Sequence, residues 1–291
     1  MTLAERVRAA ARRLEDAGLP ADDSRRDAVL LARAVLGWSA ADWLTRHHTS
    51  PPIGFDEPFQ ALIGRRAAHE PIAYITGERE FYGRPFRVTP DVLIPRPETE
   101  LLVEEALAEI AARGPGASPP RVVDVGTGSG CVAVTLALEA PATRVIGTDV
   151  SERALAVARA NAASLDARVE LCHGGLLASV PGPIDILVSN PPYVSEAERP
   201  TLSAEVGRYE PGTALFAGLD GLDVIRALLP DAARALAPGG VLVVEIGAGQ
   251  APAVTRLVSA TPGLHLVRIR ADLQGIPRIV VSRRDRGTVA R

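Results

Sequence analysis

The fold of this chain is decided by one stretch of its sequence, Ile184-Asp185-Ile186-Leu187-Val188-Ser189-Asn190-Pro191-Pro192-Tyr193. Its first part is mostly apolar and β-branched, which is typical of a strand covered on both faces of a sheet. The two prolines end the strand, because neither has an N–H group to donate to a neighbouring strand. Asn190 is therefore expected at the carboxyl end of a central strand, where open α/β sheets bind their ligands. An Asn-Pro pair on its own is also consistent with a simple strand-ending turn.

Strands and helices alternate from residue 121 onward. The hydrophobic pattern predicts strands at 121–125, 144–149, 168–172, 184–189, 241–246, 264–270 and 278–283. It predicts the intervening helices at about 130–139, 152–163, 222–236 and 250–259. This alternation predicts an α/β fold with a doubly wound, mostly parallel sheet of seven strands. The long segment 194–221 has little periodicity, and such a loop in a compact domain is usually functional.

Three parts are expected along the chain: a helical bundle at 1–75, a β-hairpin linker at 76–97 and an α/β domain at 98–291. In the bundle, apolar residues recur at helical spacing from Leu3 to Leu14, and further helices are predicted at 27–36, 40–44 and 57–68. The linker holds short alternating segments at 80–82, 86–88 and 92–94. The third part is expected to open on a helix with Pro97 near its first turn.

The net charge of the chain and of its N-terminal part indicates which class of macromolecule it binds. The whole chain is 47% hydrophobic with a formal net charge of −3, which predicts a folded core and gives no signal for a polyanion. Within 1–75, ten arginines are balanced by ten acidic residues, whereas a domain that grips a phosphate backbone should be basic. We therefore expect this bundle to dock a protein or to serve as a structural cap, with no direct nucleic-acid partner.

Other residue types bear on compartment and chemistry. The two cysteines, Cys131 and Cys172, have no metal-like spacing and fit a reducing cytoplasm. The N-terminal residues lack the apolar core of a secretory signal, and no apolar run approaches the ~20 residues that span a membrane. We therefore expect a cytoplasmic protein. The five histidines show no ligand spacing, so no metal is expected.

A second strand runs into a glycine-rich turn, Gly126-Thr127-Gly128-Ser129-Gly130. Glycines let the backbone approach a ligand closely, and the helix that follows directs N–H groups at a carboxylate or phosphate. Asp149 ends the next strand, roughly twenty residues later, where an acid typically accepts hydrogen bonds from ribose hydroxyl groups. Taken alone, the turn fits a nicotinamide dinucleotide as well as S-adenosylmethionine. Asp124 and the Asn-Pro-Pro-Tyr stretch favour S-adenosylmethionine.

These features, with several other stretches, resemble a known family. The other matching stretches are Tyr74-Ile75-Thr76-Gly77-Glu78, Phe81-Tyr82-Gly83, Leu93-Ile94-Pro95-Arg96-Pro97-Glu98-Thr99-Glu100, Tyr209-Glu210-Pro211, Ala214-Leu215 and Asp220-Gly221-Leu222. They are similar to the class I S-adenosylmethionine-dependent methyltransferases that modify planar nitrogens, and most closely to the release factor glutamine methyltransferase (HemK/PrmC) family. The resemblance covers nearly the whole chain.

The resemblance implies an activity, a cofactor and a protein partner. The methyl donor would be S-adenosyl-L-methionine. The acceptor would be the side-chain N5 of the glutamine in the Gly-Gly-Gln motif of class I peptide chain release factors, which the N-terminal bundle would help to dock. One stretch departs from the family. Where an acid and an aromatic or large apolar residue often lie near the adenine, this chain has Gly175 and Leu176, which leaves the adenine contacts open.

A mechanism is expected from these residue types. A glutamine amide nitrogen is a poor nucleophile, so the site must act by position and electrostatics. The side-chain oxygen of Asn190 and the backbone carbonyl of Pro191 would accept the two amide hydrogens, and they would bind the nitrogen more tightly as it becomes positive. Pro192 would hold the turn, and Tyr193 would pack on the amide and exclude water. Residues expected to bind the cofactor are Gly126, Thr127, Gly128, Ser129, Gly130, Asp149, Leu176 and Asn190.

Three points stay open at this stage. Arg96 and Glu98 either contact cofactor or substrate, or only cap a helix and pair on the surface. An adenine-N6 methyltransferase acting on DNA or RNA would use the same Asn-Pro-Pro-Tyr chemistry on a flipped base. A cofactor-binding module without catalysis, or a nicotinamide oxidoreductase, is the third class.

Overall fold

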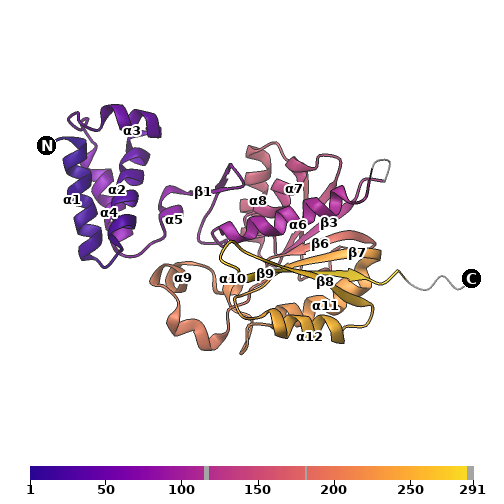
Figure 1. The fold of residues 1–291 in the computed structure, drawn as a ribbon. Helices are drawn as coiled ribbons and strands as arrows, with labels where there is room; N and C mark the ends of the chain where they lie inside the picture. Colours follow the sequence, from indigo (N-terminus) through magenta and orange to yellow (C-terminus); the bar gives the residue numbers. More distant parts are fainter. Residues whose placement is uncertain (115–117, 181, 287–291) are drawn as a thin grey trace, which may run out of the picture. The chain divides into compact units, whose positions relative to one another are not determined.

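The computed structural model describes residues 1–114, 118–180 and 182–286. These residues divide into two compact units, whose elements are labelled in Figure 1. The first contains Met1–Glu78 together with Ser203–Tyr209, and the second contains the described residues within Arg79–Leu202 and Glu210–Arg291. None of the described helices is long and apolar enough to cross a membrane.

The first unit is a bundle of helices. They are α1 (Leu3–Asp16), α2 (Ala21–Leu36), α3 (Ala40–Arg46), α4 (Asp56–Ala67) and the short α5 (Ile72–Thr76). Helix α1 begins with a capping box, in which the Thr2 hydroxyl accepts from the Glu5 N–H and the Glu5 carboxylate accepts from the Thr2 N–H. Helix α2 begins earlier than predicted, because Asp22 and Asp23 complement its N-terminal dipole.

The bundle closes over an apolar core and one buried ion pair. Fully buried side chains from three helices form the centre of this core: Leu3, Leu14, Leu31, Phe59 and Ile63. Asp27 is fully buried, and its Oδ2 accepts a hydrogen bond from Arg66 Nε at 2.7 Å. Arg66 Nη2 also donates to Glu205 Oε1 at 2.6 Å.

The contact with Glu205 bears on the segment 194–221. That segment was expected to be one loop with little regular structure. It contains a 3₁₀ helix (Glu196–Thr201), α9 (Ala204–Tyr209) and α10 (Gly212–Leu215). Helix α9 belongs to the first unit, where the Tyr209 hydroxyl also donates to the carbonyl of Ala68 at 2.8 Å. The chain therefore leaves the second unit after Leu202, contributes a helix to the bundle and returns at Glu210.

The linker contains one hairpin, formed by β1 (Glu78–Phe81) and β2 (Arg84–Arg87). The predicted β-hairpin is confirmed, and the third alternating segment, 92–94, forms no strand. Val92 and Ile94 are buried and Leu93 is half-buried. The alternation in the sequence thus reflects alternate burial along an irregular segment that is part of neither described sheet.

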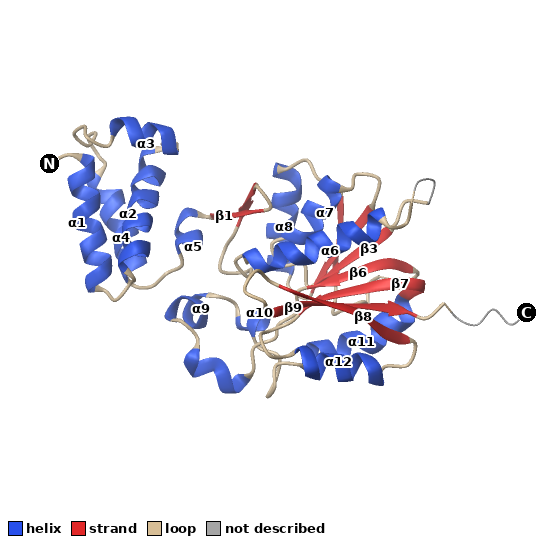
Figure 2. Ribbon diagram, viewed as in Figure 1, coloured by secondary structure: helices blue, strands red, loops and turns tan. Residues whose placement is uncertain are grey.

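Within the described residues of the second unit, seven strands form one sheet in the order β5-β4-β3-β6-β7-β9-β8 (Figure 2). Their bounds are β3 (Arg121–Val125), β4 (Arg144–Asp149), β5 (Val169–His173), β6 (Ile184–Ser189), β7 (Leu236–Glu245), β8 (Leu264–Ala271) and β9 (Pro277–Arg284). Strands β3 to β7 pair in parallel, and β9 is antiparallel to both β7 and β8. The predicted doubly wound, mostly parallel sheet of seven strands is confirmed.

Helices cover both faces of this sheet (Figure 2). The helices are α6 (Glu100–Ala111), α7 (Cys131–Glu139), α8 (Glu152–Ser164), α11 (Asp223–Ala235) and α12 (Ala251–Ala260). Helices α6, α7 and α8 pack on one face, in the same apolar cluster as Val122. Helices α11 and α12 pack on the other face with Val123, because successive side chains of a strand point to opposite faces. The Pro-Arg-Pro-Glu-Thr-Glu stretch forms a 3₁₀ turn (Pro97–Thr99) that leads into α6, as predicted.

Candidate active site

The strand register brings three chain segments to one edge of the sheet. Ser189, the last residue of β6, lies beside Val125 of β3 and Val244 of β7. The residues that follow these positions, Gly126 and Asn190, therefore emerge at the same carboxyl edge. A cavity of about 280 Å³ opens there, wholly within the second unit. This volume is near the lower end of the range for small-molecule sites.

Most of the predicted site residues line this cavity. They are Gly126, Thr127, Gly128, Ser129, Asp149, Leu176, Asn190, Pro191 and Pro192. Gly130 and Tyr193 are not among the described lining residues. A Cβ on Gly130, whose φ is 80°, would lie 3.1 Å from the Ala158 Cβ, so this glycine lets α7 pack closely on α8. The position of Tyr193 is set by Gln250, whose Nε2 donates to the Tyr193 carbonyl at 2.9 Å.

The glycine turn after β3 is fixed by hydrogen bonds to the end of the neighbouring strand β4. The N–H groups of Gly126 and Thr127 both donate to the carbonyl of Thr148, at 2.8 and 2.9 Å. Asp149 then holds the turn from the end of β4, because its Oδ2 accepts from the Gly128 N–H at 2.9 Å. Its Oδ1 accepts from the Ser151 N–H at 2.8 Å. Each carboxylate oxygen has a second lone pair, so Asp149 can still accept hydrogen bonds from hydroxyl groups in the cavity.

Asp124 lies at the base of the cavity and is only 2% exposed. The Thr127 hydroxyl donates to its Oδ2 at 2.6 Å. Burial raises the pKa of Asp124 to about 7, although the hydrogen bonds from Thr127 and the Ala133 N–H lower it. The cavity thus contains an acid that a nearby positive charge would convert to its ionised form.

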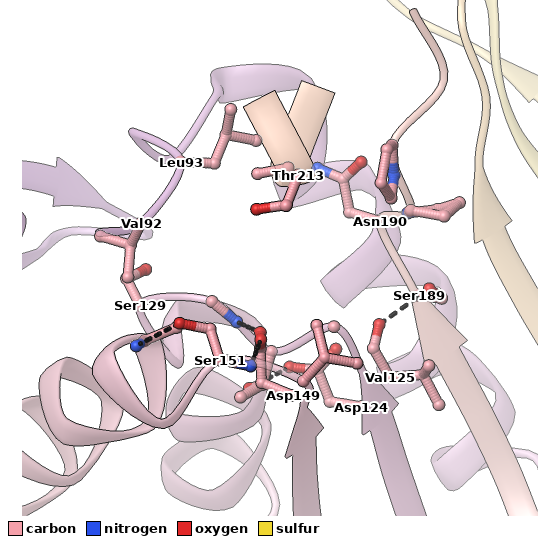
Figure 3. A pocket seen from close by; sticks show the side chains of 18 of the residues that line it. Val92, Leu93, Asp124, Val125, Ser129, Asp149, Ser151, Ser189, Asn190 and Thr213 are labelled. Carbon is pink, nitrogen blue, oxygen red and sulfur yellow. Dashed lines mark hydrogen bonds between the residues drawn. The ribbon is translucent and has the colours of Figure 1, made fainter. Parts of the chain in front are cut away.

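Asn190 lies across the cavity from these acids. In Figure 3, Asp124, Asp149 and Ser151 gather in one part of the view, and Asn190 and Thr213 lie in another. The Asn190 Nδ2 donates to the Thr99 Oγ1 at 3.0 Å. No described residue forms a hydrogen bond to the Asn190 Oδ1, so this oxygen is available as an acceptor.

Several lining residues were not predicted to contact a ligand. They come from the segment after the hairpin and from the region of the Tyr-Glu-Pro stretch: Asp91, Val92, Leu93, Pro95, Pro211, Thr213 and Ala214. Arg96 lines the cavity and its Nη2 donates to both carboxylate oxygens of Glu210, at 2.6 and 2.7 Å. Arg96 therefore lines the cavity, as expected for a residue that contacts a ligand, and it also forms an ion pair within the fold. Glu98 is not among the described lining residues.

Glu245, at the end of β7, was also missed. It is 2% exposed, and the hydroxyl groups of Thr99 and Tyr193 lie close enough to its carboxyl to lower its pKa, which burial raises. The signal was available in the sequence, because an acid at the end of the apolar run Val241-Leu242-Val243-Val244 is unusual for a strand covered on both faces. Its neighbours could not be identified from the sequence, because Thr99 and Tyr193 are far from it along the chain.

Matches to known proteins extend over both units of the chain. Residues 5–77 match the family model of the PrmC N-terminal domain, and residues 99–206 match that of the methyltransferase small domain. The chain is 46% identical over 286 residues to the release factor glutamine methyltransferase of Cereibacter sphaeroides, covering 97% of this chain and 99% of that protein. It is 42% identical over 285 residues to the protein of that name from Bradyrhizobium diazoefficiens, covering 97% and 93%.

A solved structure shows the same fold at lower sequence identity. A methyltransferase from Pyrococcus furiosus superimposes with a TM-score of 0.52 and is 19% identical, covering 78% of this chain and 98% of that chain. Its similarity concerns the fold alone. The identity to the two curated relatives extends over both units, and on that basis this chain belongs to the release factor glutamine methyltransferase family.

Proposed function

We propose that this enzyme transfers a methyl group from S-adenosyl-L-methionine to the side-chain N5 of the glutamine in the Gly-Gly-Gln motif of class I peptide chain release factors. The observation that supports this proposal most directly is the hydrogen bonding of the Asn190 side chain. Its Nδ2 is held by Thr99, and its Oδ1 stays free at the edge of a cavity built on a glycine turn and an acid. Because release factors act in translation, we expect the enzyme in the cytoplasm.

The donor set of the cavity fits S-adenosyl-L-methionine. When bound, this cofactor supplies an electrophilic methyl group on a positively charged sulfur. Asp149 offers acceptor lone pairs for a ribose diol, and Asp124 offers a buried carboxyl that suits an ammonium group. Leu176 and Val150 line the cavity with apolar surface, which suits an adenine ring although neither is aromatic.

Asn190 and Pro191 would act on the acceptor nitrogen. The Asn190 Oδ1 and the Pro191 carbonyl can each accept one hydrogen of a substrate amide, which orients the nitrogen toward the methyl donor. Neither Pro191 nor Pro192 has an N–H group that could compete as a donor. As the nitrogen gains positive charge, both acceptors bind it more strongly, so they stabilise the transition state more than the ground state.

The first unit would supply the selectivity for a release factor. Its arginines and acidic residues balance, and it exposes large apolar side chains, with Leu44 73% and Ile53 fully exposed. A second contact surface adds affinity by linkage to the first contact in the cavity. The variants Leu44→Ser and Ile53→Ser should therefore lower kcat/KM for a whole release factor. The kcat/KM for a short Gly-Gly-Gln peptide should stay unchanged. Equal effects on both substrates would contradict docking by this surface.

The direct test of the function is methyl transfer from labelled cofactor to release factor, DNA and RNA offered in parallel. We expect label on the release factor alone, and none when the glutamine of its Gly-Gly-Gln motif is replaced by alanine. Label on DNA or RNA with none on the release factor would instead favour an adenine methyltransferase. Binding of NAD rather than S-adenosylhomocysteine would overturn the cofactor.

A further inference from the structure

Glu245 is a buried acid for which the transfer reaction has no direct use. It follows Val244 in β7 as Asn190 follows Ser189 in β6, and Ser189 and Val244 are paired in the sheet. The Glu245 side chain is therefore at the same level of the sheet edge as Asn190. It is 2% exposed, and its Oε2 has no hydrogen-bond partner among the described residues. Because burying such a group is costly, its presence requires an explanation.

The groups around Glu245 connect it to Asn190. Burial raises the pKa of Glu245 to about 7, and the Thr99 hydroxyl, which lies close enough to influence this carboxyl, lowers it more than any other group. Thr99 is itself 2% exposed and accepts the hydrogen bond from the Asn190 Nδ2 at 3.0 Å. One hydroxyl group is thus situated between the buried carboxyl and the amide of Asn190.

The chemistry of a hydroxyl group gives this arrangement a direction. A threonine hydroxyl has one hydrogen to donate and two lone pairs. If that hydrogen is directed to Glu245, Thr99 can only accept from Asn190, and the group of Asn190 that faces it must be the NH2. The Oδ1 must then face the cavity. Without an acceptor at position 245, the hydroxyl can donate to the Asn190 Oδ1 equally well, and the amide can turn over.

We propose that Glu245, acting through Thr99, is a positioning residue that fixes the orientation of the Asn190 amide so that its oxygen faces the methyl acceptor. This inference rests on the proposed function, because it assigns the Asn190 oxygen a reacting amide hydrogen to accept. The Tyr193 hydroxyl also influences this carboxyl, so both ends of the Asn-Pro-Pro-Tyr turn are connected to one buried acid, Asn190 through Thr99 and Tyr193 directly.

The test compares variants of similar shape that keep or remove one hydrogen-bonding group. Thr99→Val and Glu245→Leu remove the donor and the acceptor, whereas Thr99→Ser and Glu245→Gln retain them. We expect the first two to lower kcat about tenfold, the loss expected for one net hydrogen bond, and the second two to stay within about threefold of the wild type. KM for the release factor and the affinity for S-adenosylhomocysteine should stay nearly constant throughout.

Thr135→Val is the matched control for Thr99→Val. Thr135 is fully buried in α7, and its hydroxyl has no hydrogen-bond partner among the described residues. This change removes the same atoms from the interior without touching the connection from Glu245 to Asn190. It should leave kcat unchanged. A loss of kcat equal to that of Thr99→Val would show a general packing effect and overturn the inference.

The double variant Thr99→Val, Glu245→Leu separates one connected pathway from two independent effects. If Glu245 acts through Thr99, the double variant should lose no more than the larger single loss. Losses that multiply would overturn the inference. If the Glu245→Leu protein fails to fold, the test rests on comparing Thr99→Val, Thr99→Ser and Glu245→Gln. Equal activity of these three variants would also overturn the inference.

A readout without turnover distinguishes this inference from the proposed function. The side-chain NH2 resonances of Asn190, assigned by their absence in Asn190→Ala, should shift in Thr99→Val and remain in place in Thr135→Val. Wild-type protein that methylates no release factor but shows this pattern would refute the substrate and retain the positioning role. An Asn190 NH2 signal that is insensitive to both Thr99→Val and Glu245→Leu would refute the positioning role by itself.

Discussion

One carboxyl group buried in the bundle and two buried at the carboxyl edge of the sheet are compensated differently. In the bundle, Asp27 is fully buried and accepts from Arg66 at 2.7 Å, so its charge is neutralised within the fold. In the second unit, Asp124 and Glu245 are each 2% exposed, and no described arginine forms an ion pair with either. Burial raises the pKa of both groups to about 7.

The difference indicates that the Asp27 carboxylate contributes to the stability of the bundle, whereas Asp124 and Glu245 contribute to the functional site. A buried pair is insensitive to ligands, and removing one partner leaves the other uncompensated. A buried acid whose nearest partners are hydroxyl groups keeps its capacity for a further partner, and such perturbed acids gather at functional sites. We therefore expect changes in the bundle pair to affect stability, and changes at the cavity to affect binding and turnover.

The largest effect is expected for Arg66→Met. It leaves Asp27 buried without its partner, which costs about 3–5 kcal/mol. Both tryptophans of the chain, Trp38 and Trp43, lie in the first unit, so tryptophan fluorescence during denaturation follows that unit selectively. The double variant Arg66→Met, Asp27→Leu should recover much of the loss.

The control for this change is Arg25→Met, in the same unit. Arg25 pairs with Asp22 on the surface of the bundle, where both side chains are more than half exposed, and such pairs contribute about 0–1 kcal/mol. A small effect of Arg66→Met, similar to that of Arg25→Met, would show that the buried pair does not stabilise the bundle.

The next effect concerns turnover. Asn190→Ala removes one of the two acceptors for the substrate amide, and the loss of one such preorganised group costs about 10²–10³ in rate. Unfolding and the affinity for S-adenosylhomocysteine should change little, because the Asn190 amide contacts Thr99 rather than the apolar core. Near-normal kcat in this variant would refute the mechanism.

Asn190 and the glycine turn could be predicted from the sequence because their signals are local. Asn190 and the turn Gly126–Gly130 each follow a recognisable strand, and parallel strands bring their carboxyl ends together. Thr99 and Glu245 could not be joined to Asn190 in advance, because their proximity depends on how β6 and β7 align and on where the 3₁₀ turn packs. The same limit applies to α9, whose place in the bundle depends on the pairing of Glu205 with Arg66.

A smaller effect is expected in the pH dependence of stability. The folded state holds a proton on Glu245 up to a pKa of about 7, whereas the unfolded chain releases it near 4.5. The folded state therefore binds more protons between these values, and the free energy of unfolding falls as pH rises through that window. Hydroxyls of Thr99 and Tyr193 and the charge of Arg278 reduce this effect, and Glu98 increases it.

Glu245→Gln removes the ionisable group and should abolish this part of the pH dependence. Relative to the wild type, the variant should gain stability from pH 4.5 to pH 8, by roughly 3 kcal/mol at most. Denaturation at a series of pH values measures the difference. A constant difference across that range would show that Glu245 titrates normally in the folded protein.

The last prediction concerns Asp149, an acid held by backbone N–H groups rather than by an arginine or a hydroxyl. Asp149→Ala should weaken the binding of S-adenosylhomocysteine, because it removes hydrogen bonds to a charged group worth about 1.5–3 kcal/mol. The same change also frees the N–H of Gly128, so a loss of affinity alone would not identify the ribose as the partner. Calorimetry with the 2′-deoxy analogue of the ligand separates the two effects. The wild type should bind this analogue more weakly than the parent ligand, and Asp149→Ala should bind both alike. If the variant still discriminates between them as strongly as the wild type, the ribose hydroxyl is held by another residue and Asp149 serves only to fix the glycine turn.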